Sequence, residues 1–428
     1  MKKALCCILS FVICITLCGC NVLSELSSAF TEFLTDSDYG QIILMDEKVE
    51  TYKIDPHPID DNEIAFLYCY QQLDKEQKRI YKLIYSAVEK MQKGWIELGI
   101  SRDSFSSDIA IAYQALNHDH PELFWMPYTY LLSSTEKSGS LYAYIALSHS
   151  KDGYSCNYLI DADALQSMKN EFESKISEIL SEAKGKSLYE SELIFHDYLC
   201  RNTEYIKESE ESLVYTAYGA LVNGTAVCEG YSRAMQVLCK RAGIPCVLIT
   251  GTAQGENHMW NLIDPGDGWY HTDVTWDDTA DPLYSSYIYF NLNDADISIT
   301  HSPAVHYSKL KTDTISLKNI FNILDIRCVK NEYNYFEHED LILSNDSANK
   351  TAQRILLASA DGNIQLQMKF EDTVVATKFK NDYNEAVALI QDELYSIAGR
   401  KAPVIDNITL TDSTVSFYWQ SILLWYNR

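Results

Sequence analysis

Basic residues are scarce in this chain. Lys and Arg together number 35 against 60 Asp and Glu, so that the formal net charge of the 428 residues is -25 at pH 7. Affinity for nucleic acids comes largely from Lys and Arg side chains that neutralise phosphates, and a strongly acidic surface repels such polyanions. The charge balance therefore argues against DNA and RNA, and we expect no nucleic-acid partner.

Long apolar runs are scarce as well. The run from Ala4 to Leu17 follows two lysines and is too short for a comfortable membrane-spanning helix, which needs roughly 18 apolar residues, and no other run reaches that length. A basic start followed by a short apolar run is typical of a secretory leader. The residues Leu17-Cys18-Gly19-Cys20 that follow resemble a bacterial lipobox, in which the cysteine is lipidated and becomes the new N-terminus.

These features predict a lipoprotein. We expect residues 1–19 to be the signal peptide, Cys20 to carry the lipid, and the protein to be extracytoplasmic and lipid-anchored to the cell membrane. A plain leader or a retained anchor is the alternative.

The chain also lacks the cysteine pairs that typify zinc sites. Seven of the twelve cysteines lie beyond Cys20, and no two of them are spaced as CxxC. We interpret the cluster from His118 to His120 as ordinary turn residues, and Asp277-Asp278 as a loop cap, because no spaced oxygen-ligand pattern surrounds that pair. We therefore expect no metal and no cofactor, while the spacing of the cysteines leaves disulfide pairing open.

What is present is a cysteine at a predicted helix start. Apolar residues after Cys228 recur at helical spacing until Gly243 and Pro245. Unpaired backbone N–H groups and the positive end of the helix dipole favour a thiolate at such a position and can donate to an oxyanion. The adjacent Glu229 adds a negative charge that works against this effect.

A predicted hairpin follows. Two strands flank the turn-forming residues 264–267, and if Ile263 faces Gly268, His258 lies directly opposite Asp273 on one face. A one-residue slip would separate the two side chains. His271 shares that face and is a rival base, but its place beside the turn puts it far from Cys228.

Cys228, His258 and Asp273 thus come in the order of nucleophile, base and orienting carboxylate. His196, on a helix predicted over 188–202 that starts with the capping box Ser187–Glu190, could be a second catalytic histidine, although we favour a helix residue packed beneath the site. Further elements are predicted by periodicity and turn signals: helices at 61–93, 162–182 and 382–397, and strands at 141–148, 154–160, 355–359, 364–370, 408–411 and 414–419.

The blocks 219–234, 244–250, 258–263 and 269–278 resemble the transglutaminase-like superfamily, whose fold is related to papain. The segments 120–125 and 194–199 resemble the version found in bacterial surface proteins, so the resemblance covers about residues 115–295. It implies an α+β fold in which the cysteine-bearing helix packs on an antiparallel sheet. It also implies Cys228 as nucleophile, His258 as base and Asp273 as orienting acid, without choosing between hydrolysis and crosslinking.

A chain of this length is too long for one ordinary core. We expect five segments: a signal peptide at 1–19, a tether at 20–60, an N-terminal α+β region at 61–185, a transglutaminase-like catalytic core at 186–300 and a small C-terminal α+β module at 301–428.

The favoured hypothesis is a surface-anchored thiol enzyme that acts on peptide or side-chain amides, such as those of cell-envelope material, through a cysteine thioester. The alternative is a non-catalytic surface protein for binding or assembly that uses the same fold as a scaffold, with the 30 tyrosines lining recognition grooves.

Overall fold

The computed structural model describes residues 40–42, 50–100, 105–151, 154–207, 211–279, 285–303, 326–345, 347–360 and 363–419. They fall into two compact units, one of Met1–Glu171 with Pro303–Asp325 and one of Phe172–Ser302 with Ile326–Arg428. The predicted signal peptide, the lipidation site at Cys20 and most of the predicted tether lie outside the described residues. Within the described ranges, no helix is long and apolar enough to cross a membrane.

The first unit is built on a five-stranded sheet with the order β1-β4-β5-β3-β2. Its strands are β1 (Gly40–Ile42), β2 (Thr51–Tyr52), β3 (Trp95–Ile100), β4 (Tyr130–Lys137) and β5 (Ser140–Ala146), with a separate pair β6 (His149–Lys151) and β7 (Tyr154–Cys156). Its helices are α3 (Asp61–Ile64), α4 (Tyr68–Gln72), α5 (Lys75–Glu89) and α6 (Phe105–Asp119).

Two predictions for this unit are wrong. The single helix expected over 61–93 is three helices, because the Asp119 carboxylate accepts two backbone N–H groups at the start of α4 and the Asp74 carboxylate accepts two at the start of α5. The strand expected at 154–160 is only β7, which ends at Cys156 and pairs antiparallel with β6, while β5 pairs antiparallel with β4 and β3.

The long helix α7 (Ala162–Glu182) confirms the prediction for 162–182, and α8 (Leu188–Asn202) begins at the predicted capping box. In that box the Ser187 hydroxyl accepts the backbone N–H of Glu190, and the Glu190 carboxylate accepts the backbone N–H of Ser187. The start of α8 was therefore readable from local chemistry alone.

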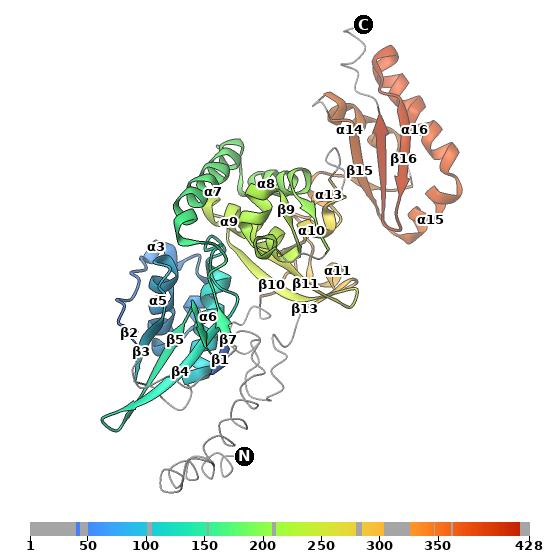
Figure 1. The fold of residues 1–428 in the computed structure, drawn as a ribbon. Helices are drawn as coiled ribbons and strands as arrows, with labels where there is room; N and C mark the ends of the chain where they lie inside the picture. Colours follow the sequence, from blue (N-terminus) through green and yellow to red (C-terminus); the bar gives the residue numbers. More distant parts are fainter. Residues whose placement is uncertain are drawn as a thin grey trace, which may run out of the picture. The chain divides into compact units, whose positions relative to one another are not determined.

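The second unit contains the core around Cys228. Helix α9 (Cys228–Ala242) packs against strands β10 (Cys246–Ala253) and β11 (Glu256–Ile263), as Figure 1 shows. The four-stranded sheet has the order β12-β11-β10-β13, with β12 at Tyr270–Thr272 and β13 at His301–Pro303, and β11 pairs antiparallel with β10 on one side and with β12 on the other. The predicted fold class is confirmed: this is an α+β core in which the cysteine-bearing helix lies on an antiparallel sheet.

Shorter elements complete the core. They are β8 (Glu204–Tyr205) paired with β9 (Thr225–Ala226), a 3-10 turn at Ser212–Tyr215, a π turn at Gly219–Asn223, and the one-turn helices α10 (Val274–Asp277) and α11 (Asp294–Ile297).

The predicted register of the hairpin is wrong by two residues. Ile263 pairs with Tyr270 rather than Gly268, because the Asp264 carboxylate accepts the N–H groups of Gly266 and Gly268 and the turn extends as far as Trp269. A shift of two residues keeps every side chain on its face. Asp273 lies beyond the end of β12, where it caps α10.

The second unit also contains a small α+β module, which begins later than the expected residue 301, because β13 (His301–Pro303) belongs to the core sheet. Its sheet has the order β14-β15-β17-β16, with the bounds β14 (Ile342–Leu343), β15 (Gln365–Phe370), β16 (Ile405–Leu410) and β17 (Thr414–Trp419). The helices are α13 (Tyr335–His338), α14 (Ala348–Ala360), α15 (Thr373–Asn381) and α16 (Tyr383–Ala398).

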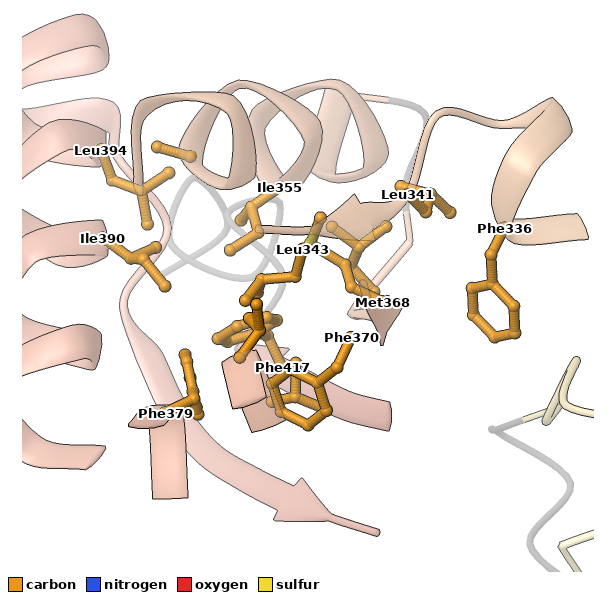
Figure 2. Packing of buried hydrophobic residues seen from close by; sticks show 14 of the residues in the cluster. Phe336, Leu341, Leu343, Ile355, Met368, Phe370, Phe379, Ile390, Leu394 and Phe417 are labelled. Carbon is orange, nitrogen blue, oxygen red and sulfur yellow. The ribbon is translucent and has the colours of Figure 1, made fainter. Parts of the chain in front are cut away.

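Apolar side chains from these helices and strands form one buried cluster, in which Ile355, Met368 and Phe417 are fully covered (Figure 2). The strand expected at 355–359 is wrong: those residues belong to α14, whose buried positions Thr351, Ala352 and Ile355 follow helical spacing.

Candidate active site

Cys228 is the first residue of α9. The residue before it, Val227, makes no side-chain capping bond, so no side chain of the N-cap occupies the N–H groups at this helix end. The seven cysteines of the described residues are all free, and Cys228 is partly exposed whereas the other six are buried. Among these seven thiols, Cys228 is therefore the one that solvent can reach.

The first turn of α9 is held from two sides. The Ser232 hydroxyl lies 2.9 Å from the carbonyl oxygens of both Cys228 and Met259, which ties the helix to β11. A side chain at Gly230 would place Cβ only 2.5 Å from the Val214 carbonyl oxygen, so glycine permits this close approach. The Glu229 carboxylate, expected to oppose a thiolate, is paired with Arg233 at 2.8 Å, and this ion pair offsets its charge.

His258 and Asp273 are in direct contact. His258 Nε2 donates to Asp273 Oδ2 at 2.6 Å, and the backbone N–H of Trp276 donates to the other carboxylate oxygen at 3.2 Å. The two side chains meet although their residues are not paired in the sheet, because Asp273 reaches back from its capping position on α10.

This contact sets the charge of the pair. Burial acts to lower the pKa of His258, but the charge and hydrogen bond of Asp273, with a smaller contribution from the Cys228 thiol, raise it to about 10. Burial acts to raise the pKa of Asp273, and the neighbouring histidines bring it below its ordinary value. At neutral pH the pair is therefore an imidazolium and a carboxylate. Because Nε2 faces Asp273, the other ring nitrogen, Nδ1, is left for the thiol.

A second histidine, His301, contacts the same carboxylate oxygen. His301 Nε2 donates to Asp273 Oδ2 at 2.9 Å, and the residue is almost completely buried. Sequence reasoning missed it, since β13 joins the sheet at β10 through a pairing between segments far apart in the chain. No local motif around Thr300-His301-Ser302 signals this position.

The rival base His271 has other partners. The Trp260 indole N–H donates to His271 Nδ1 at 3.0 Å, and because an indole nitrogen can only donate, Nδ1 is the unprotonated nitrogen. Nε2 therefore carries the hydrogen and donates to Asp294 at 3.1 Å. Burial lowers the pKa of His271, which fits a neutral structural imidazole.

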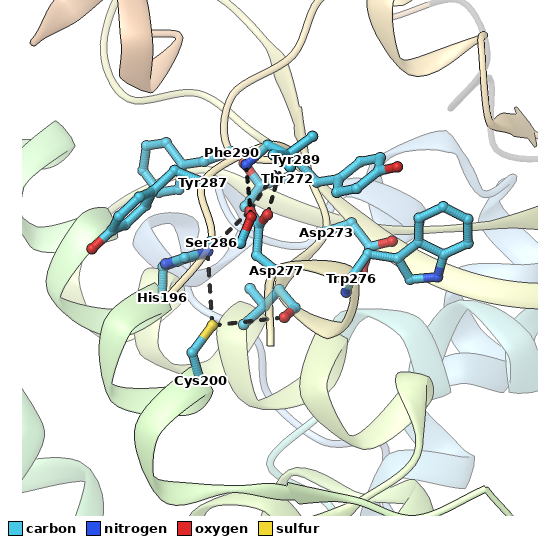
Figure 3. Close-up of polar contacts among 12 residues, drawn as sticks. His196, Cys200, Thr272, Asp273, Trp276, Asp277, Ser286, Tyr287, Tyr289 and Phe290 are labelled. Carbon is cyan, nitrogen blue, oxygen red and sulfur yellow. Dashed lines mark hydrogen bonds and ion pairs between the residues drawn. The ribbon is translucent and has the colours of Figure 1, made fainter. Parts of the chain in front are cut away.

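His196 belongs to a second buried set of Cys, His and Asp side chains, drawn in Figure 3. Its Nε2 lies 3.2 Å from Asp277 Oδ2 and 3.9 Å from Cys200 Sγ. A relay needs the thiol and the carboxylate on different ring nitrogens. Here Cys200 and Asp277 face Nε2 while Asp197 lies 3.3 Å from Nδ1, but Cys200, His196 and Asp277 are all buried, so this thiol is shielded from solvent.

Asp277 caps a loop, as predicted, but from inside the core. Its carboxylate is fully buried and also accepts the backbone N–H of Tyr289. Asp278 accepts the hydroxyl of Tyr231 on α9 at 2.6 Å. The acidic pair thus anchors α10 inside the core.

Two groups of possible metal donors occur among the described residues, each with its donor atoms within 4.8 Å of one another: His258, Asp273 and His301, and His271, Asp294 and Cys328. In the first group both Nε2 atoms already donate to the carboxylate, and in the second the protonated Nε2 of His271 has no lone pair for a metal. Hydrogen bonds thus account for the histidine contacts of both groups. In the first unit, Asp119 accepts the N–H groups of Cys69 and Tyr70 at the start of α4, rather than lying in a turn.

Residues 176–274 match a family model described as the Transglutaminase-like superfamily. The match contains Cys228, His258 and Asp273, so the core carries a transglutaminase-like domain, over a narrower range than the expected 115–295. Comparison with curated proteins gave no match.

Solved structures give weak similarities. A protein described as a candidate cysteine protease from Cytophaga hutchinsonii is 17% identical over 34% of this chain and 61% of its own, with a TM-score of 0.22. A structure described as a TGase is 14% identical over 43% of this chain and 52% of its own, with a TM-score of 0.24. Menin, described with its binding site for the Mixed Lineage Leukemia protein, is 12% identical over 56% of this chain and 48% of its own, with a TM-score of 0.21. The chain spans less than two thirds of each, and similarities of this size carry no inference about activity.

Proposed function

We propose that the protein is a thiol enzyme that transfers the acyl group of peptide or protein amides through a thioester on Cys228. The observation that supports this most directly is the pair of His258 and Asp273, joined at 2.6 Å and set beside the one partly exposed thiol of the described residues. The match of residues 176–274 to the transglutaminase-like superfamily fits this class of chemistry.

The proposed reaction begins with attack of the Cys228 sulfur on the amide carbonyl. The new S–C bond places negative charge on the carbonyl oxygen, and the backbone N–H groups at the start of α9 can stabilise this oxyanion. His258 enters the reaction as an imidazolium and gives its proton to the leaving amine as the C–N bond breaks. The products of this half are an amine and a thioester.

In the second half, water or an amine attacks the thioester. His258, now neutral, takes the proton of the attacking group, the C–S bond breaks, and the thiolate with its imidazolium is restored. Asp273 stabilises the imidazolium at both stages and keeps its Nε2 hydrogen in place. The acceptor that reaches the thioester decides between hydrolysis and crosslinking.

We place this activity at the cell surface, on cell-envelope amides, as a part of the proposal. Its support is the sequence of the N-terminus, where a basic and apolar leader ends in the lipobox-like residues before Cys20.

The proposal is tested by alkylation. Iodoacetamide should modify Cys228 much faster than the buried Cys239 under native conditions, and replacing His258 with Ala should slow the reaction at Cys228 near neutral pH. A matched control is His57→Ala in the first unit, where the histidine pairs with Glu89 and should not affect the rate. Equal modification of Cys228 and Cys239 in the wild-type protein would refute the enzyme hypothesis.

A second candidate is a binding or assembly protein. It is favoured by large apolar side chains exposed on helices of the C-terminal module, among them Leu357, Val374 and Leu389. Under this hypothesis Cys228→Ala would keep the biological effect, whereas charged residues at those three positions would remove it. The opposite result would support the enzyme.

A further inference from the structure

We infer that His301 is a positioning residue of the proposed active site: it holds the Asp273 carboxylate in place and in its charged form, so that Asp273 in turn orients His258. This inference rests on the proposed function. It adds His301 to Cys228, His258 and Asp273 as a fourth residue of the site. This residue comes from β13, a strand outside the hairpin.

The geometry of Asp273 is the first argument. Its Oδ2 accepts from His258 at 2.6 Å and from His301 at 2.9 Å, while Oδ1 accepts the Trp276 N–H at 3.2 Å. The donors come from β11, β13 and the backbone of α10, and therefore approach from separate elements. A carboxylate held by these three hydrogen bonds cannot rotate without breaking several of them at once.

The state of His301 is the second argument. A carboxylate can only accept, so Nε2 of His301 carries a hydrogen, and Nδ1 lies 2.8 Å from the Thr300 hydroxyl. The ring is packed between Trp276, with centroids 4.7 Å apart, and Trp260, at 5.0 Å. Both ring nitrogens have hydrogen-bond partners and two indoles pack against the ring at tilted and edge angles, as expected of a side chain that fixes another and does not itself react.

The third argument is the cost of a buried carboxylate. Asp273 is almost fully buried, and such a group stays ionised only when donors and opposite charge compensate for lost water. The hydrogen bond from His301 is among the contacts that lower the pKa of Asp273. Without it, Asp273 would take up a proton at a higher pH, and the orienting charge behind His258 would be lost earlier on acidification.

Other titratable groups near this pair bear on the same pH range. They are Cys228 on α9, Tyr205 on β8, Asp277 on α10, and Tyr289, which follows α10 in the chain. Burial raises the pKa values of Tyr205 and Tyr289, so both tyrosines stay neutral where Asp273 titrates. Burial and the charge of Asp273 work to raise the pKa of Asp277, so on acidification Asp277 takes up its proton before Asp273, whose pKa is lowered.

The test compares two variants. His301→Phe keeps a planar ring but has no donor, and His301→Gln keeps an N–H near the position of Nε2. The first readout is the pH dependence of iodoacetamide alkylation at Cys228. The second is the downfield proton resonance of the bond between His258 and Asp273, followed by NMR in a Cys228→Ala background, which needs no reactive thiol.

We expect His301→Phe to move the acid loss of both signals to higher pH by about one unit, the size typical of a lost charge-stabilising contact, and His301→Gln to restore most of the wild-type behaviour. Unchanged profiles in His301→Phe, or equal changes in both variants, would overturn the inference. If Cys228 is not selectively alkylated but the NMR signal follows the expected pattern, the proposed function fails while the positioning role stands.

Discussion

The most informative perturbation is Asp273→Asn. It keeps the size of the side chain but removes the charge that both His258 and His301 face. The pKa of His258 is about 10 against an ordinary value of 6.5, and at 1.36 kcal/mol for each pH unit this difference corresponds to roughly 5 kcal/mol in favour of the imidazolium. Most of that preference comes from Asp273, because burial alone opposes the charged form.

In the variant we therefore expect His258 to titrate at or below its ordinary value. At about pH 7.5 no more than about one-tenth of it would then be imidazolium, so that alkylation of Cys228 should slow by about tenfold or more. The assay is stopped-flow alkylation with iodoacetamide, combined with NMR titration of the His258 ring.

The matched control is Asp294→Asn, which changes the carboxylate facing His271, a buried histidine on β12 of the same sheet. It should leave the alkylation rate unchanged. The reasoning is refuted if His258 still titrates near pH 10 in Asp273→Asn, or if the two variants slow the reaction equally.

Stability provides a check with a defined sign. Because the pKa of His258 is raised, its contribution to the stability of the folded protein is full below the ordinary pKa of 6.5 and is lost as the pH rises through about 10. Because the pKa of Asp273 is lowered, its contribution to stability is full above the ordinary pKa of 3.8 and is lost on acidification. The stability difference between the wild-type protein and Asp273→Asn should therefore be largest between about pH 4 and 6.5, measured by urea unfolding, and a difference that grows toward pH 10 would contradict the pairing. Gly230→Ala should destabilise by about 1–3 kcal/mol in thermal unfolding, because its Cβ would meet the Val214 carbonyl, while Ser177→Ala on the exposed face of α7 should have little effect. His196→Phe should cost about 3–5 kcal/mol in urea unfolding by removing the imidazole that pairs with the buried Asp277 carboxylate, and a neutral result would show that this pair does not anchor α10. Treatment with EDTA should leave the alkylation rate unchanged, because the histidine nitrogens that could bind a metal at Asp273 already donate hydrogen bonds to it. A loss of rate that added zinc restores would show that the site does hold a metal.

Local chemistry made several elements readable from the sequence. The capping box of Ser187 and Glu190 starts α8 as predicted, and the apolar spacing after Cys228 predicts α9, because both signals act within a few residues. The strand expected at 355–359 failed for a related reason: a short apolar run satisfies both periods, and packing in the module selected the helix.

The site itself was only partly readable. The contact of His258 with Asp273 was expected from a hairpin register that is wrong by two residues, and it forms because the face is preserved and Asp273 caps α10. His301 could not be found in this way, since its position depends on a strand that joins the far edge of the sheet. Pairing between distant segments leaves no short-range pattern in the sequence.

The position of β13 in the sequence, beyond the end of the family match, matters for the choice of domain boundaries. The family match ends at residue 274, immediately after Asp273 and inside the single turn of α10. A fragment trimmed to that match would keep the three residues that define the proposed chemistry, yet it would lack Asp277, which anchors the turn, and His301, which grips the carboxylate. The smallest piece of the chain with a complete site therefore extends at least through β13, and an inactive shorter fragment would say nothing about the activity of the whole.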